Sequence, residues 1–284
     1  MYNAGRWLLG TIGLAAIYAM TAHAAKPEPL ILAVHPYLPP NEVLQRFNPL
    51  ADYLASKIGR PVEVRVGRDY EDHIAAIGGR RVDFAFIGPA AYIKLVANHG
   101  PHPLLARLEV NGKPYLTGVI VTRQDSPLRR LADLKGKRFA FGDPDSTMSH
   151  IVPLYMLIKA GVPERALGQQ RFLGAHKNVA LAVLSGDFDA GAVKDEVYQE
   201  YAAKGLRVLA TLPPVSEHLF VTRVDLPAAD VDRLRSALLG LKTQPDTKKI
   251  LSEIHRDATA LVPVTDADYD SLRTITRTVD SARH

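Results

Sequence analysis

The sequence predicts an α/β protein made of two lobes around a ligand cleft, joined by two crossover segments. From residue 30 onward, short apolar runs typical of strands take turns with stretches that have apolar residues at helical spacing. This series divides into two units of about a hundred residues each, the size of an ordinary domain. Extended segments near 118–122 and 212–221 would carry the chain between them. The 284 residues, 47% of them hydrophobic, are enough to give both units a core.

Each expected element follows from its local pattern. Strands are expected at 30–35, 61–66, 82–88, 102–110, 115–123, 137–141, 170–174, 188–193, 206–212 and 218–223. Helices are expected at 41–59, 69–79, 89–100, 131–136, 147–161, 178–186, 195–205, 228–241, 247–254 and 266–279. Gly59 is expected to end the first helix, and Asp69 and Pro89 to open the next two. Strand–helix–strand order with short loops predicts mainly parallel strand pairing.

The N-terminus has the pattern of a secretory signal peptide over residues 1–24. Arg6 precedes a short apolar run, and Ala22-His23-Ala24 offers small residues on both sides of a cleavage site. We therefore expect an exported protein that is cleaved at this point, with an uncleaved membrane anchor as the alternative. The chain has no cysteine, which excludes disulfides, thiol chemistry, cysteine-bound zinc and a lipoprotein anchor.

Charge and motifs exclude several function classes. The 35 basic and 30 acidic residues are scattered without a long basic run, so no nucleic-acid partner is expected, although a mild positive field favours anionic ligands. The sequence lacks HExxH and close His-x-His pairs, and neither a metal nor a cofactor is expected. Ser146 or Ser149 with a histidine and an aspartate can be arranged on paper as a nucleophilic triad, but no GxSxG elbow is present.

One turn is crowded with hydroxyls. In FGDPDSTMSH, residues 141–150, a strand runs into a turn, and Ser146, Thr147 and Ser149 then occupy the first turn of a helix. A single capping hydroxyl satisfies one or two of the free N–H groups of such a turn. The free N–H groups and the helix dipole also suit a phosphate-like anion, to which further hydroxyls would donate. The residues alone leave both interpretations open.

The order and spacing of four segments resemble the phosphonate, phosphite and phosphate-binding family of ABC-transporter substrate-binding proteins. The resemblance covers essentially the whole mature chain, and its segments are 48–64, 69–92, 134–153 and 174–193. It implies a type II periplasmic-binding-protein fold that closes on its ligand by hinge motion. Lobe 1 would comprise 25–120 and 217–284, and lobe 2 would comprise 121–216.

The resemblance also implies a function. The protein would capture a small phosphorus oxyanion (phosphonate, phosphite or phosphate) in the periplasm and deliver it, as a monomer without a cofactor or catalytic residues, to a membrane permease. The alternatives are a periplasmic sensing protein that partners a membrane sensor kinase and, with less support, an exported hydrolase.

The family's turn usually reads D-P-x-S-T-S-G, and its serine and threonine grip the oxyanion together with backbone N–H groups. Ser146 and Thr147 match these positions. Met148 stands where the second serine is usual, and Ser149 stands where glycine is usual. The resemblance therefore implies an oxyanion site here, and the two departures leave the ligand open.

Four further positions carry over from the family. Tyr70 and Tyr115 match tyrosines that contact the ligand, and His176 matches a histidine that bonds the oxyanion. Glu196 aligns with an acid that holds the ammonium group in aminophosphonate binders, whereas His218 stands where those binders place a second acid. Each of the four also has a structural alternative, as a core aromatic, a structural histidine or a solvated helix residue.

Overall fold

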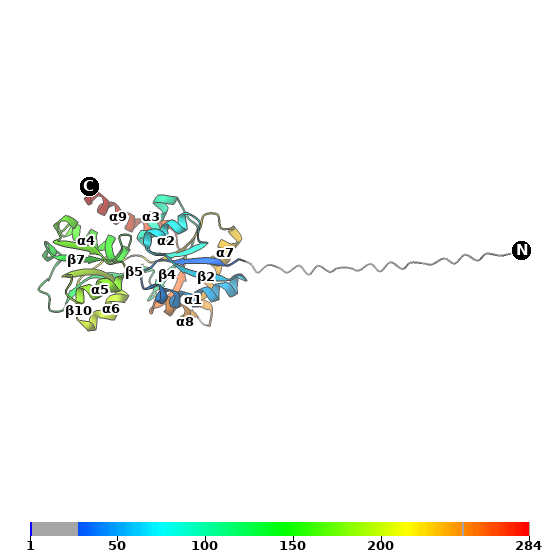
Figure 1. Cartoon of the computed structure of the whole chain (residues 1–284), viewed down its shortest axis with the longest axis horizontal. Helices are drawn as coiled ribbons and strands as arrows, with labels where there is room; N and C mark the ends of the chain where they lie inside the picture. The colour runs from blue at the N-terminus through cyan, green and yellow to red at the C-terminus, as the bar shows by residue number, and fades with distance from the viewer. Residues whose placement is uncertain (2–27, 246, 284) are drawn as a thin grey trace.

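The computed structural model describes Met1 and residues 28–245 and 247–283, so the expected signal peptide lies, apart from Met1, outside the described residues. Two α/β lobes lie side by side, with the short strand β5 between them (Figure 1). Among the helices of the described residues, none is both long enough and apolar enough to span a bilayer. The predicted two-lobed α/β class is confirmed.

The first lobe contains a six-stranded sheet in the order β13-β4-β12-β3-β1-β2. Its strands are β1 Leu30–Val34, β2 Val62–Val66, β3 Phe84–Ile87, β4 Leu104–Val110, β12 Leu219–Thr222 and β13 Ala258–Val262. Its helices are α1 Pro40–Ile58, α2 Tyr70–Gly78, α3 Pro89–His99, α7 Ala228–Gly240 and α8 Thr247–Ile254, with 3₁₀ turns Leu241–Thr243 and Asp266–Tyr269. One face of the sheet packs against α1, α7 and α8, and the other packs against α2 and α3.

The second lobe contains a five-stranded sheet in the order β10-β6-β9-β7-β8. Its strands are β6 Gly118–Arg123, β7 Arg138–Phe141, β8 Gln169–Phe172, β9 Ala190–Lys194 and β10 Leu206–Thr211. Its helical segments are a π-helical turn Thr147–Ile151 that runs into α4 Val152–Lys159, then α5 His176–Leu184 and α6 Asp195–Tyr201, with 3₁₀ turns Leu131–Leu134, Glu164–Ala166 and Ala202–Lys204. Between the lobes, β5 Tyr115–Leu116 pairs antiparallel with β11 Val215–Ser216, so the two crossovers are hydrogen-bonded to each other.

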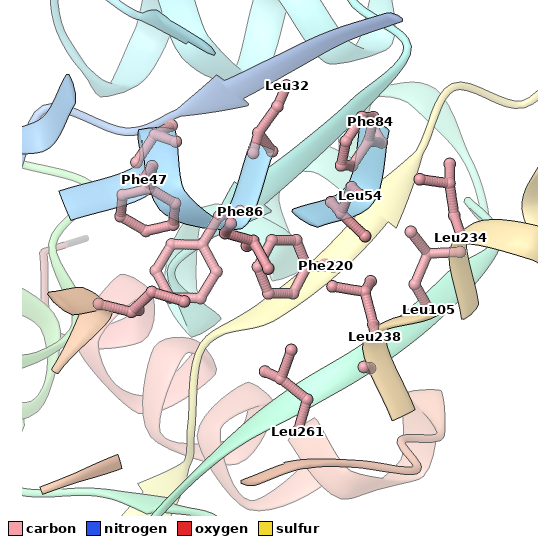
Figure 2. Packing of buried hydrophobic residues seen from close by; sticks show 14 of the residues in the cluster. Leu32, Phe47, Leu54, Phe84, Phe86, Leu105, Phe220, Leu234, Leu238 and Leu261 are labelled. Atoms are coloured by element: carbon pink, nitrogen blue, oxygen red, sulfur yellow. The ribbon is translucent and has the colours of Figure 1, made fainter. Parts of the chain in front are cut away.

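The core of the first lobe shows why the apolar spacing of the sequence produces these layers. Figure 2 shows Phe47 and Leu54 of α1 against Phe86 and Phe220 of the sheet. The first two residues lie seven positions apart, two turns of a helix, and therefore face the same side. Burying a side chain of this size contributes roughly 1.5–3 kcal/mol.

Local signals for helix ends are confirmed. Gly59 ends α1 in the left-handed conformation at φ 71°, which glycine adopts without strain, and its N–H donates to the Ala55 carbonyl. Asp69 opens α2 by accepting the N–H of Asp72 at 2.7 Å. These caps fix where α1 and α2 meet the neighbouring strands.

The pairing differs from the mainly parallel arrangement expected. The pairs of β1 with β2 and β3, and of β7 with β8 and β9, are parallel. The pairs made by β6 and β12 are antiparallel. Because β6 and β12 are the strands that enter a new lobe from a crossover, they start at the cleft edge and run against their neighbours. The sheets are therefore mixed.

The C-terminal part also differs from expectation. Strand β13 was not predicted, and it pairs antiparallel with β4 at the edge of the first sheet. Helix α9, Asp270–Arg283, was expected with the first lobe, but Leu272 and Val279 pack into the apolar cluster around α4 of the second lobe. Figure 1 shows α9 lying over that lobe. Helix α9 thus packs against α4 of the second lobe and also contacts α3 of the first. Strand β6 begins at Gly118, ahead of the expected boundary after residue 120.

Candidate functional site

A small cavity of about 10 Å³ lies in the cleft between the lobes. It brings together four of the predicted site residues, Tyr70, Ser146, Thr147 and His176, from both lobes. The other lining residues are Tyr37, Gly88, Leu116, Met148, Lys194 and His218. The lobes of this structure are therefore closed on a volume close to that of a single water-sized probe.

Five helices begin at this cavity. Tyr70 and His176 are the first residues of α2 and α5. Gly88, Ser146 and Lys194 are the N-cap residues of α3, of the π-helical turn that leads into α4, and of α6. The positive ends of helix dipoles from both lobes therefore gather around one place, an arrangement that favours a bound anion.

The turn at 141–150 combines capping with free donors. The Ser146 Oγ accepts the N–H of Ser149 at 3.2 Å, so Ser146 is the N-cap. The helix opens as a wide π-turn, in which Ile151 N–H donates to the Ser146 carbonyl at 3.0 Å. Thr147 and Met148 are the first two residues of this turn, and their N–H groups have no intrahelical acceptor. The cap and the anion site are thus compatible.

The three hydroxyls of this turn have different partners. Ala90, at the start of α3 in the first lobe, donates its N–H to the Thr147 Oγ1 at 2.9 Å across the cleft. The oxygen of Thr147 is thereby occupied as an acceptor, and its proton remains for a ligand. The Ser149 hydroxyl instead donates to the carbonyl of Ala192 in β9 at 2.5 Å, which fixes it within the second lobe.

Gly88 supplies the closest backbone approach from the first lobe. A Cβ placed on Gly88 would lie 3.6 Å from Nε2 of His218 and 4.0 Å from Oγ1 of Thr147. A side chain at this position would therefore project into the cavity, and glycine keeps that space open.

His176 is a neutral donor held in one tautomer. Its Nδ1 accepts the backbone N–H of Lys194 at 3.1 Å, so the ring proton lies on Nε2. Nε2 is 3.4 Å from the Ser146 Oγ. Burial, together with the positive charge of Lys194, lowers the pKa of His176 to about 3. The histidine therefore offers an N–H without adding charge.

Two buried tyrosines complete the donor set. Tyr37 and Tyr70 are both almost fully buried, and burial raises the pKa of each phenol well above its ordinary value. Both phenols therefore keep their protons.

Asp143 shapes the turn, as expected, because its Oδ1 accepts the N–H of Asp145 at 2.8 Å.

Tyr115 and Glu196 lie in a second, wider cavity of about 90 Å³ that shares Tyr37, Leu116, Lys194 and His218 with the first. Tyr115 belongs to β5 in the first crossover and is 52% exposed. The structure thus places these two predicted residues beside the small cavity and not in its wall.

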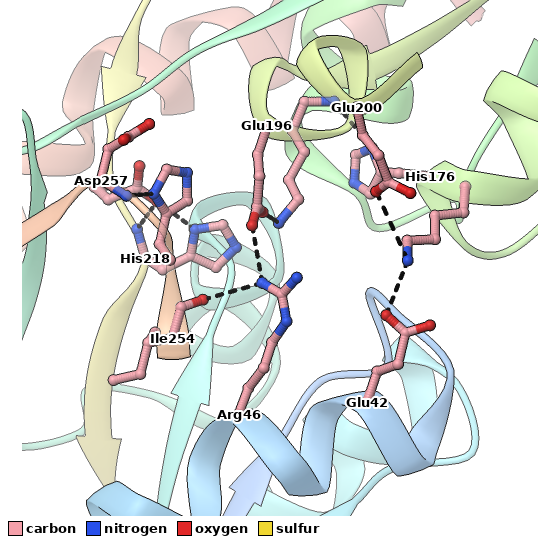
Figure 3. A network of polar contacts seen from close by, with 12 residues as sticks. Glu42, Arg46, His176, Glu196, Glu200, His218, Ile254 and Asp257 are labelled. Atoms are coloured by element: carbon pink, nitrogen blue, oxygen red, sulfur yellow. Dashed lines mark hydrogen bonds and ion pairs between the residues drawn. The ribbon is translucent and has the colours of Figure 1, made fainter. Parts of the chain in front are cut away.

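Glu196 is held by two cations. Its Oε1 is 2.8 Å from Arg46 Nη1 and its Oε2 is 2.5 Å from Lys194 Nζ. Figure 3 shows Arg46 reaching from α1 to Glu196 at the start of α6, which links the lobes. Burial would raise the pKa of Glu196, but the charges of Lys194, His255 and Arg46 outweigh it and hold this pKa well below its ordinary value.

A second carboxylate, that of Glu217, is also paired. Glu217 is buried, and its carboxylate contacts Nδ1 and accepts the backbone N–H of His218. Burial would raise the pKa of Glu217, but the hydrogen bonds and charge of His218 lower it overall. The His218 ring stacks on His35 and Phe86 at centroid distances of 5.0 and 5.2 Å. The segment between β11 and β12 thus presents an aromatic, paired side chain to the cleft.

Sequence reasoning missed Tyr37, Gly88 and Lys194. Gly88 and Lys194 each end a buried strand and precede a helix, which is the same signal that singled out Ser146. Tyr37 lies in the loop after β1, where periodicity gives no signal. No group of three or more potential metal ligands is found within the part of the chain that the structure describes.

Comparison with known proteins decides the family. The family model for the phosphonate periplasmic substrate-binding proteins of ABC transporters matches residues 32–269. The chain belongs to this family. The phosphonate-binding family consists of transport proteins that bind a substrate, and the expected recognition is confirmed.

Individual members of the phosphonate-binding family resemble the chain along most of its length. A phosphate-import protein of Mycolicibacterium smegmatis, PhnD, is 28% identical over 87% of this chain and 84% of its own. A Prochlorococcus marinus protein solved with methylphosphonate has a TM-score of 0.81 at 22% identity, covering 90% of this chain and 99% of its own. A phosphonate-transporter binding protein of Pseudomonas aeruginosa has a TM-score of 0.82 at 20% identity, covering 91% of this chain and 88% of its own. The structural matches support the type II periplasmic-binding-protein fold.

Proposed function

We propose that the protein captures a small phosphorus oxyanion (phosphonate, phosphite or phosphate) in the periplasm and presents it to the permease of an ABC transporter. The observation that carries this proposal is the convergence of five helix starts from both lobes on one cavity. Tyr37, Tyr70, Ser146, Thr147 and His176 add side-chain donors there. A tetrahedral oxyanion has three or four acceptor oxygens, and it loses its water only if several donors replace that water together.

The donor set also suits repeated capture and release. Tyr70, Ser146, Thr147 and His176 are neutral, so they orient the oxyanion without the strong charge attraction that would hinder its transfer to a permease. Lys194 provides a cation near them. The names of the relatives agree with this ligand class, since one imports phosphate and another was solved with methylphosphonate.

The proposal also includes the hinge, export and oligomeric state. Tyr115 would act at the hinge beside the wider cavity, because it belongs to the crossover strand β5. Export would follow from residues 1–24 acting as a cleaved signal peptide. The protein would work as a monomer without catalytic activity, because hinge closure within one chain completes the site.

Thermal denaturation with ligands tests the proposed function. A ligand that binds only the folded state at a hundred times its Kd stabilises that state by about 2.7 kcal/mol, which corresponds to roughly 5–11 °C in Tm. We expect such a rise with phosphite, phosphate or methylphosphonate at about 1 mM, a concentration at which even a weak site responds. If none of these compounds raises Tm, the proposed ligand class is wrong.

Small-angle scattering tests the hinge and the oligomeric state together. Saturating methylphosphonate should reduce the radius of gyration of a monomer, because the crossovers β5 and β11 allow the lobes to approach each other. A mass twice that of the chain, or a radius that ligand leaves unchanged, would contradict this part of the proposal.

A further inference from the structure

The oxyanion cavity and the wider cavity meet at Lys194. This residue lines both cavities, and only 8% of it is exposed. Its ammonium nitrogen lies 4.2 Å from the centroid of the Tyr37 ring and 2.5 Å from Oε2 of Glu196. Lys194 is therefore one of four residues, with Tyr37, Leu116 and His218, that a substituent would meet if it extended from a phosphorus atom in the small cavity toward the wider one.

The carboxylate next to Lys194 already has two positive partners. Arg46 binds one oxygen of Glu196 and Lys194 binds the other. One negative and two positive charges leave a net charge of +1 in the cluster Arg46–Glu196–Lys194. A third cation brought to this largely buried place would meet repulsion that water screens poorly. The other acids that line the wider cavity are Glu217, which is paired with His218, Asp257, which lies 3.7 Å from Arg256, and Asp195.

We propose that Lys194 makes the site selective for phosphorus oxyanions without an amino substituent, and that the cluster Arg46–Glu196–Lys194 excludes phosphonates that carry an ammonium group. This inference rests on the proposed function and names the substrate class of the same site. Lys194 attracts the oxyanion, and it also occupies the carboxylate that would otherwise hold an ammonium group. Glu196 therefore positions Lys194 and does not contact the substrate's own cation.

A matched pair of ligands tests this selectivity on the unaltered protein. Propylphosphonate and 2-aminoethylphosphonate have the same number of non-hydrogen atoms and differ in a methyl group against an ammonium group. Calorimetric titration should show propylphosphonate binding at least about tenfold more tightly, a difference of about 1.4 kcal/mol. Equal or tighter binding of 2-aminoethylphosphonate would overturn the inference and point to Asp195, another carboxylate lining the wider cavity.

Two variants assign the selectivity to the cluster. Lys194→Met keeps most of the apolar stem of the side chain. It should weaken propylphosphonate binding by roughly tenfold or more, and it should bring the affinities for the two ligands closer together. Lys204→Met is the matched control, because the Lys204 ammonium also lies over a tyrosine ring, that of Tyr201 at 4.1 Å, yet it lines neither cavity. The control should leave both affinities unchanged.

Glu196→Gln separates the two possible roles of the carboxylate. With Lys194 released from Glu196, propylphosphonate should bind as tightly as before or more tightly, and 2-aminoethylphosphonate should remain the weaker ligand. A selective loss of 2-aminoethylphosphonate binding would show that Glu196 holds the ammonium group, and would refute the inference.

The outcomes also distinguish this inference from the proposed function. If phosphite, phosphate, methylphosphonate and propylphosphonate all fail to bind, the proposed function fails. If they bind and 2-aminoethylphosphonate binds equally well, only the selectivity fails. The comparison of the two ligands uses the unaltered protein. It can therefore still refute the inference if the Lys194→Met variant fails to fold.

Discussion

Replacing Thr147 by valine is the sharpest test of the oxyanion site. Valine keeps the shape of threonine and removes only the hydroxyl. In the structure this hydroxyl oxygen accepts the N–H of Ala90 from the other lobe at 2.9 Å. Its proton is then available to an oxyanion, so a chain of hydrogen bonds would run from Ala90 through Thr147 to the ligand.

The expected loss follows from these contacts. A hydrogen bond to a charged group contributes roughly 1.5–3 kcal/mol, so Kd should rise about tenfold to over a hundredfold. The ligand-free protein loses less free energy than the complex, because the Ala90 N–H can bind water when the lobes open. A loss of roughly 1 kcal/mol corresponds to a fall of about 2–4 °C in Tm.

Thr122→Val is the matched control for this experiment. The Thr122 hydroxyl is fully buried in β6 and donates to the Asp189 carbonyl at 2.7 Å, away from both cavities. It should lower Tm by a similar amount and leave Kd unchanged. We would measure Kd by calorimetric titration with methylphosphonate and Tm without ligand. If Thr147→Val lowered Tm like the control while keeping Kd within about twofold of the wild type, a difference below 0.5 kcal/mol, the site would be misplaced.

Three further predictions concern closure, packing and pH. Arg46→Met removes the ion pair with Glu196 between the lobes, and should shift the ligand-free protein toward open forms by about 1 kcal/mol; an unchanged radius of gyration would contradict this. Met148→Ser empties part of a buried cluster and should cost about 2 kcal/mol, or roughly 4–8 °C in Tm; an unchanged Tm would show that the space refills. Burial lowers the pKa of His73 to about 4 and that of His176 to about 3, so the unfolded chain takes up protons below pH 6.5 before the folded protein does. Each of these two histidines should therefore lower the free energy of unfolding by up to about 1.4 kcal/mol for every pH unit below 6.5. Urea midpoints at pH 7.5 and 5 should differ less in His73→Phe, and an undiminished difference would refute this assignment.

Local patterns predicted most of the elements because burial in this fold follows sequence periodicity. The end of α1 at Gly59 and the cap of α2 at Asp69 depend on neighbouring residues alone. The edge strand β13 depends instead on pairing with β4, about 150 residues away in the chain. Helix α9 was predicted as a helix, but its amphipathic pattern does not say which lobe covers Leu272 and Val279.

The same distinction applies to the site. Ser146 and Thr147 were found because hydroxyls at a strand-to-helix turn are a local signal. The state of Glu196 was not accessible in this way, since Arg46 lies 150 residues earlier in the chain. Lys194 reaches Glu196 only because a helix start bends the chain between them. Residue types therefore predicted four residues that line one cavity, whereas the charge balance around that cavity required the three-dimensional contacts.

In the turn FGDPDSTMSH, the observed cap at Ser146 leaves room for the proposed anion binding. What decides the role of each hydroxyl is the direction of its proton. Ser146 Oγ is filled by the Ser149 N–H and faces Nε2 of His176, and Thr147 Oγ1 is filled by the Ala90 N–H. Both oxygens accept a backbone N–H, so each hydroxyl still has its proton to donate, and Ser146 also lies within hydrogen-bonding reach of Tyr70.

Ser149 is the opposite case. Its hydroxyl donates to the Ala192 carbonyl, and a Cβ placed on Gly142 would lie 2.5 Å from its oxygen, so the side chain is enclosed by the second lobe. The family's usual hydroxyl one position earlier is replaced here by Met148, whose side chain is buried. In the proposed site, Ser146 and Thr147 would therefore be the two hydroxyls that contact a ligand, and the N–H groups of Thr147 and Met148 would add donors from the same turn.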